Sequence, residues 1–206
     1  MTISAQPHRQ HRPAWVTALQ VIGAFVVFLY VVEAVDSVLG NRLDFAGVQP
    51  RDADGLDGIL FAPILHGGWM HLAANTIPLL VLGFLILLSG VARWVAVTAV
   101  VWVVGGVGTW LIGQPNSVHI GASVLVFGWL VYLLLRGIFS RRPTQVAIGV
   151  LVLFVYGGAL WGVLPMQAGI SWQAHLFGAL GGAIAAWWLA SRDRGITTGD
   201  RTTLRA

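Results

Sequence analysis

The segment SWQAHLFGALGGAIAAWWLA, residues 171–190, indicates how this chain folds, because small residues recur in it at every fourth position. Gly178, Gly182 and Ala186 share one face of a helix, and a face of this kind lets two helix backbones approach closely inside a bilayer. His175 precedes Gly178 by three residues and lies on nearly the same face. The segment therefore predicts a closely packed helix that carries an imidazole near its contact with a neighbour.

The composition of the chain is that of a membrane protein. Apolar residues make up 57% of the 206 residues and charged residues only 10%, whereas about a quarter of a soluble chain is charged. There is no cysteine, so disulfides and thiolate chemistry are excluded. The net charge of +4 does not indicate nucleic acid as a partner, because the arginines are scattered over short loops.

Six apolar segments are long enough, or nearly so, to cross a hydrocarbon core that requires about 20 helical residues. They predict an all-α, polytopic membrane protein with a six-helix bundle at 14–190, between a cytoplasmic tail at 1–13 and another at 191–206. The expected helices are Ala14–Val35, Met70–Leu88, Trp94–Ile112, Ile120–Leu135, Val146–Leu164 and Trp172–Ala190.

The arginines predict the orientation of this bundle, since positively charged loops stay in the cytoplasm. One side carries Arg9, Arg12, Arg93, Arg136, Arg141, Arg142, Arg192, Arg194, Arg201 and Arg205, and the other only Arg42 and Arg51. The protein is therefore expected to lie in the inner (plasma) membrane with both termini in the cytoplasm. The first apolar run is longer than that of a signal peptide, and we interpret it as an anchor.

The first outer loop, residues 36–69, is long for a connection within a bundle. Its acidic residues lack the spacing of a calcium-binding EF-hand, so a solvated loop is expected. Its last part, together with the start of the next helix, reads ILFAPILHGGWMHLAAN at 59–75, which is apolar enough for an element that re-enters or lies on the membrane.

Polar side chains within apolar segments are the candidates for function, because each is costly in a bilayer unless it has a partner or faces water. His71 and Asn75 share one face of the second segment, Ser123 lies near the outer end of the fourth, and His175 near the outer end of the sixth. All four are thus expected at a similar depth. His119 is expected to be a loop residue at the outer interface.

This set of polar groups is suited to acyl transfer. A serine hydroxyl is a poor nucleophile until a base takes its proton, and histidine is the usual base. His71 and Asn75 would donate hydrogen bonds to the oxyanion of a tetrahedral intermediate. Taken singly, Ser123 is best explained as a packing residue, and His71 with Asn75 could join two helices. The four together favour an enzyme.

The motifs HGGWMHLAAN (66–75), GAS (121–123) and SWQAHLFGALGG (171–182) resemble those of the rhomboid intramembrane serine proteases. The resemblance implies a Ser–His dyad, with Ser123 as nucleophile and His175 as general base. It also implies that His71 and Asn75 stabilise the oxyanion with the Ser123 N–H, and that His66 is structural. The implied partners are transmembrane protein substrates and the lipid bilayer, with no cofactor and no metal. The family points to the fifth helix and the loop after it as the entry for substrate.

Two positions depart from the family pattern. The residue after the nucleophile is Val124 where rhomboids have glycine, and its branched side chain is predicted to crowd the sixth helix or to reshape the substrate pocket. Phe127 replaces a residue that is often tyrosine, and it is expected to pack under the histidine ring. No Trp–Arg motif is evident in the first outer loop.

Two other functions remain open on the sequence. Val124 motivates a rhomboid-like pseudoprotease that binds transmembrane helices without cleaving them. Several histidines in apolar surroundings motivate a haem-binding membrane protein, which would need two imidazoles facing each other. Six glycines are expected to be close-packing positions: Gly83, Gly105, Gly106, Gly108, Gly157 and Gly158.

Overall fold

The computed structural model describes residues 12–166 and 169–203, those from 191 onward as backbone alone. Its α-helices are α1 (Ala14–Val38), α2 (Gly58–Phe61), α3 (Trp69–Leu87), α4 (Val91–Ile112), α5 (Ser123–Ser140), α6 (Pro143–Tyr156) and α7 (Trp172–Thr203). Short 3-10 helices are η1 (Leu43–Ala46), η2 (Ala53–Gly55), η3 (Ala62–Ile64) and η4 (Gly157–Val163). Within the described ranges the extended pairing is an isolated bridge between Val48 and His119. The prediction of an all-α fold is confirmed.

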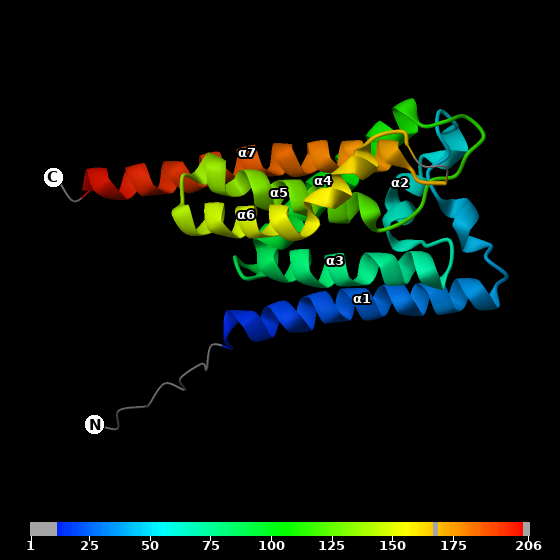
Figure 1. Cartoon of the computed structure of the whole chain (residues 1–206), viewed down its shortest axis with the longest axis horizontal. Coiled ribbons are helices and arrows are strands. Elements are labelled where there is room, and N and C mark those ends of the chain that lie inside the picture. Colours follow the sequence, from blue (N-terminus) through cyan, green and yellow to red (C-terminus); the bar gives the residue numbers. More distant parts are fainter. Residues whose placement is uncertain (1–11, 167–168, 204–206) are drawn as a thin grey trace, which may run out of the picture.

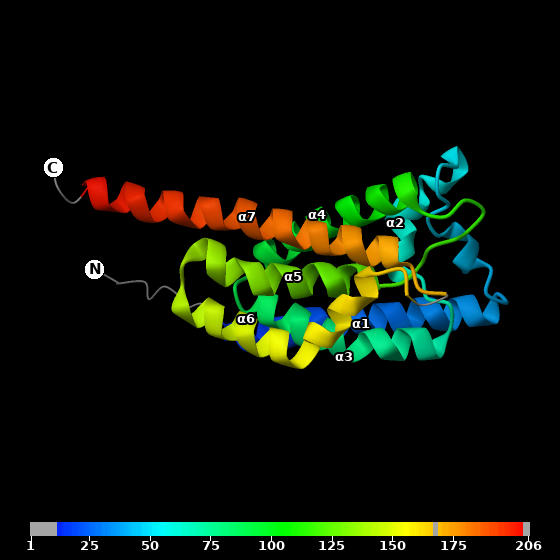
Figure 2. The same ribbon diagram turned by 45° about the horizontal axis from the view of Figure 1, so that its top comes forward.

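Long apolar helices make this a polytopic membrane protein. Among the described residues, five spans are long and apolar enough to cross a bilayer, namely α1, α3, α4, α5 and α6 continued by η4. The sixth predicted segment is α7, whose first turns carry the polar side chains Gln173 and His175. α7 nevertheless packs along both α4 and α5, and the long helices run side by side along the bundle (Figures 1 and 2).

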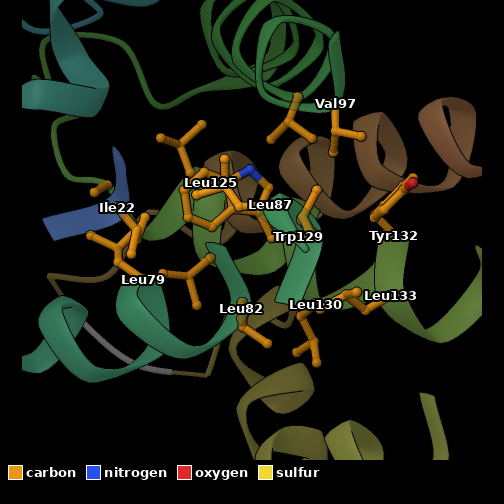
Figure 3. Close-up of a cluster of buried hydrophobic side chains, with 14 of the residues drawn as sticks. Ile22, Leu79, Leu82, Leu87, Val97, Leu125, Trp129, Leu130, Tyr132 and Leu133 are labelled. Carbon is orange, nitrogen blue, oxygen red and sulfur yellow. The ribbon is translucent and has the colours of Figure 1, made fainter. Parts of the chain in front are cut away.

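Helix α5 lies at the centre of the bundle, in contact with α3, α4, α6 and α7. Its Leu125, Trp129 and Leu130 are fully buried and meet Leu79 of α3 and Ile22 of α1 in one apolar cluster (Figure 3). The indole N–H of Trp129 donates a hydrogen bond to Thr98 of α4 over 3.2 Å, which satisfies this buried polar atom. These contacts fix the position of α5 and hence that of Ser123, its first residue.

The small residues of α7 bring its backbone close to a neighbouring helix, as the sequence predicts, and that neighbour is α5. A Cβ atom on Gly178 would collide with the carbonyl oxygen of Val124, and one on Gly182 would collide with that of Gly128. Larger side chains at these two glycines would push the helices apart. This contact holds the first turn of α7 beside the first turn of α5.

The fifth predicted helix is shorter than expected. Val146–Leu164 was predicted as one helix, but α6 ends at Tyr156 and the chain tightens into η4. The Gly157–Gly158 pair weakens an α-helix at this point, because glycine costs about 1 kcal/mol relative to alanine there. Gly158 is also not the close-packing position expected from the sequence, since no neighbouring atom lies within 4 Å of the place of a Cβ. By contrast, Gly83, Gly105, Gly106 and Gly108 are closely packed, as predicted.

The first outer loop is bound to the end of α4. The Arg51 guanidinium donates to the carbonyl oxygens of Leu111 and Gly113, over 3.3 and 3.0 Å, where a helix end leaves carbonyl groups without partners. The indole N–H groups of Trp102 and Trp110 donate to loop carbonyl oxygens. The loop is thus held in place by hydrogen bonds to α4 and covers one end of the bundle (Figure 1).

Candidate active site

The first residues of α3, α5 and α7 gather at the end of the bundle where α2 lies (Figures 1 and 2). A cavity of ≈ 990 Å³ lies there. His71, Asn75, Ser123 and His175 all line it. The structure thus brings together the four side chains that the sequence analysis selected, from three different helices.

Ser123 is the first residue of α5, and its hydroxyl is hydrogen-bonded to His175. The Ser123 Oγ and His175 Nε2 atoms are 2.9 Å apart. The turn before the serine is possible because Gly121 has a φ of 124°, a left-handed conformation that glycine adopts readily. The Ser123 N–H belongs to the first turn of a helix, where amide groups have no intrahelical acceptor and the helix dipole favours negative charge.

The imidazole of His175 is held on both its face and its edge. The Phe127 ring stacks on it with centroids 4.0 Å apart and planes inclined by 9°, so the expectation for Phe127 is confirmed. His175 Nδ1 lies 2.9 Å from the carbonyl oxygen of Gly162 in η4. A carbonyl oxygen can only accept, so Nδ1 carries the proton in the neutral ring and Nε2 is free to accept from the Ser123 hydroxyl. This is the tautomer that a general base requires.

His71 lines the cavity with one ring nitrogen close to Gly121. Its Nδ1 accepts a hydrogen bond from the Gly67 N–H over 3.4 Å, so the neutral ring carries its proton on Nε2. A Cβ atom on Gly121 would lie 2.8 Å from His71 Nε2 and 3.7 Å from Ser123 Oγ. Glycine at 121 therefore leaves open the space between a donor N–H and the hydroxyl, where an oxyanion would form.

Asn75 lies one helical turn beyond His71 and is buried beside the cavity. Its side-chain amide donates to the carbonyl oxygen of His71 over 3.1 Å. That bond uses one of the two N–H groups of the amide, and the other remains a possible donor to a bound group. The amide also ties its own position to that of the His71 backbone.

His66 supports the backbone in front of the nucleophile. Its Nε2 atom accepts a hydrogen bond from the Ala122 N–H over 3.3 Å, and its ring lies edge-on to that of His71 with centroids 5.2 Å apart. Burial, with a smaller contribution from His71, lowers the pKa of His66 to about 4. The ring is therefore neutral at pH 7, and its hydrogen bond holds the backbone that precedes Ser123.

Val124 does not reshape the cavity, contrary to our prediction. Its side chain is buried and lies outside the lining of the cavity that contains Ser123. It points toward α4, where a Cβ on Gly105 would collide with Val124 Cγ2. It does not force α7 away either, because Gly178 has no side chain to meet it. Two glycines thus accommodate the extra volume of the valine.

His119 has a more specific role than the loop residue we expected. Its two ring nitrogens are hydrogen-bonded to serine hydroxyls, Nε2 to Ser117 at 2.9 Å and Nδ1 to Ser171 at 2.6 Å. Burial lowers its pKa, and the ring lines the same cavity as Ser123. It joins the loop before α5 to the residue that precedes α7.

Sequence reasoning missed the contacts of Gly162 and of His119. Gly162 touches the site through a backbone carbonyl, which leaves no signal in the sequence. His119 could have been noticed because Ser117 lies two residues before it, although Ser171 is distant in the chain. His119 and His175 are poorly placed to ligate a haem iron, because both ring nitrogens of each are hydrogen-bonded to protein atoms.

Comparison with known proteins agrees with the family that the motifs resemble. An uncharacterized protein of Mycobacterium tuberculosis is 51% identical over 191 residues, covering 89% of this chain and 80% of the relative. One from Mycobacterium leprae is 49% identical, covering 89% and 76%. YdcA of Bacillus subtilis, named as a candidate rhomboid protease, is 28% identical over 79% of this chain and 82% of its own. No solved structure matches significantly. The model of the Rhomboid domain matches residues 55–192, and the chain belongs to the rhomboid family.

Proposed function

We propose that this protein is an intramembrane serine protease that hydrolyses peptide bonds in or near transmembrane segments of other membrane proteins. The observation that carries the proposal is the 2.9 Å hydrogen bond between Ser123 Oγ and His175 Nε2 at the wall of a large cavity. The hydrogen bond joins nucleophile to base, and the stacked Phe127 holds the base in place. Membership of the rhomboid family supports the same reaction class.

The proposed reaction proceeds by acyl transfer. Ser123 Oγ attacks the carbonyl carbon of the scissile peptide while its proton moves to His175 Nε2. The resulting oxyanion accepts hydrogen bonds from His71 Nε2–H and the Ser123 N–H, with Asn75 close by. His175 then gives its proton to the leaving amine as the C–N bond breaks. A water molecule, deprotonated by His175, attacks the ester and releases the carboxylic acid together with free Ser123.

We place the cavity on the outer side of the plasma membrane, with both termini in the cytoplasm. Arg93 in the first turn of α4, and Arg141 and Arg142 between α5 and α6, lie at the end of the bundle opposite to α2 (Figure 1). Positively charged connections favour the cytoplasm, which supports this orientation. The outer placement gives water and the substrate segment access to Ser123 without crossing the bundle.

Cleavage of a transmembrane substrate in proteoliposomes tests the proposal. A panel of single-span substrates with small residues near the outer membrane surface is incubated with wild type, Ser123→Ala and His175→Ala. We expect a cleavage product with wild type only, while all three proteins have similar thermal stability. Binding of a substrate segment without cleavage would instead favour the pseudoprotease. The residue that motivated that alternative, Val124, lies away from the cavity.

A further inference from the structure

The geometry points to Gly162 as a positioning residue for the proposed reaction: its carbonyl oxygen, on η4, orients the general base His175. This inference rests on the proposed function for its catalytic consequence, but the orientation itself is a property of the structure. The carbonyl lies 2.9 Å from His175 Nδ1, on the side of the ring opposite to Ser123. It has the place that a carboxylate has in a serine protease triad.

The carbonyl selects one of the two neutral tautomers of His175. With the proton on Nδ1, the ring donates to Gly162 and accepts from Ser123, and both hydrogen bonds are made. With the proton on Nε2, two lone pairs face each other at the Gly162 edge, and the ring can no longer take the serine proton. When the imidazolium forms, its Nδ1–H remains bound to an acceptor, which stabilises the positive charge.

A side chain at residue 162 would disturb this contact. A Cβ at this position would lie 2.8 Å from Phe127 Cζ and 3.2 Å from His175 Nδ1. The Phe127 ring is stacked on the imidazole and buried, so it cannot turn aside freely. A methyl group at 162 would therefore push η4 away from both rings and lengthen the hydrogen bond.

The orienting carbonyl belongs to the least buried of the five candidate membrane spans among the described residues. In the most apolar part of the α6–η4 span 11% of the residues are buried, against 56% in α5. Cavities of ≈ 990 and ≈ 540 Å³ lie against η4, and Ala159 and Met166 line both. Displacement of η4 by an entering segment would remove the acceptor from His175 Nδ1. His175 is therefore held as the proton acceptor of Ser123 only while η4 lies against α7.

Gly162→Ala tests the inference, with Gly158→Ala as its matched control. Both substitutions add a methyl group to a glycine of η4, but at Gly158 no atom lies within 4 Å of the added carbon. In wild type, ¹⁵N NMR of histidine-labelled protein, with signals assigned through His175→Gln, should show His175 protonated on Nδ1. Gly162→Ala should populate the Nε2–H tautomer and lower the rate of fluorophosphonate labelling roughly 10- to 100-fold, since a shift of about 1 Å can cost that much. Gly158→Ala should match wild type in both measurements.

The outcomes separate this inference from the proposed function. If wild type shows the Nδ1–H tautomer but never reacts with the probe, the proposed protease fails and the positioning contact stands. If His175 in wild type is protonated on Nε2, the contact is contradicted whatever the activity. Equal tautomers and labelling rates in Gly162→Ala and Gly158→Ala would also overturn it. If Gly162→Ala does not fold, the tautomer of His175 in wild type tests the inference by itself: protonation on Nδ1 supports it and protonation on Nε2 contradicts it.

Discussion

Val124 Cγ2 occupies the space that a side chain at Gly105 would need. The valine follows the proposed nucleophile, yet it faces α4 and α7 rather than the cavity. The valine that replaces the rhomboid glycine on α5 therefore packs into the space left by a glycine on α4. Substitution of Val124 is therefore expected to change the stability of the protein and not the rate of its reaction.

Val124→Gly should destabilise the protein by roughly 1–3 kcal/mol, because it leaves a void between α4, α5 and α7 and places glycine in a helix. It should not speed the reaction with a serine probe. Gly105→Ala alone should also be destabilising, since its methyl group collides with Val124 Cγ2. Combined with Val124→Gly, the same Gly105→Ala should be tolerated. Thermal unfolding in detergent measures this double-mutant cycle, and simple additivity of the two changes would contradict the contact.

Gly121→Ala should abolish most activity. Its φ of 124° is unfavourable for alanine, and the methyl group would lie 2.7 Å from His71 Cε1 in the space assigned to the oxyanion. Gly90→Ala is the control, because Gly90 has a φ of 108° but no atom within 4 Å of its added carbon. Both variants should lose about 1–2 kcal/mol of stability from backbone strain. Only Gly121→Ala should lose probe labelling, by roughly 100-fold or more, and equal labelling of the two variants would argue against an oxyanion site there.

Stability should fall as the pH rises through about 6, because of Asp44. Burial, followed by the neighbouring Asp36, raises the pKa of Asp44 to about 6 from an ordinary value of 3.8. Between pH 3.8 and about 6, the carboxyl group of Asp44 is protonated in the folded state but ionised in the unfolded chain. The stabilisation that this proton provides therefore falls across that range and is absent above it. Asp44→Asn removes the titration, so its unfolding temperature should decline less than that of wild type between pH 4 and about 7. Parallel curves for the two proteins would contradict the shift.

His119 and Ser171 should be energetically coupled. His119→Phe keeps a ring but removes both hydrogen bonds to serine hydroxyls, at an expected cost of about 1–3 kcal/mol. Ser171→Ala removes one of those bonds together with the bond that Ser171 Oγ accepts from the Ala174 N–H. The double variant should cost less than the two single changes added together. Costs that simply add would mean that the 2.6 Å contact contributes nothing to stability.

Much of the fold could be predicted from sequence because bilayer physics leaves a strong pattern. Apolar length predicted the helices, and the small residues of α7 predicted its close contact with a neighbouring helix. The same reasoning placed Ser123 and His175 at one depth. It failed at η4, where a helix of Val146–Leu164 was expected, because a Gly–Gly pair inside an apolar run does not reveal whether the helix continues.

The partners of side chains were harder to predict than their depth. The sequence predicts that Val124 crowds the sixth helix or reshapes the pocket, because it does not reveal that Gly105 of another helix lies opposite to the valine. Asp44 and Asp36 are eight residues apart, and their proximity depends on the path of the loop after α1. The carbonyl of Gly162 is a backbone atom that every residue possesses. Such contacts are set by tertiary packing, which residue types do not encode one by one.

The most direct test of the proposed dyad is covalent labelling by a fluorophosphonate probe, followed by mass spectrometry of the modified peptide. Wild type should be labelled on Ser123, whereas Ser123→Ala should give no adduct. His175→Ala should react at least about 100-fold more slowly, because the serine has lost its base. An adduct formed equally in Ser123→Ala, or the absence of any adduct in wild-type protein that is folded and embedded in bilayers, would contradict the account.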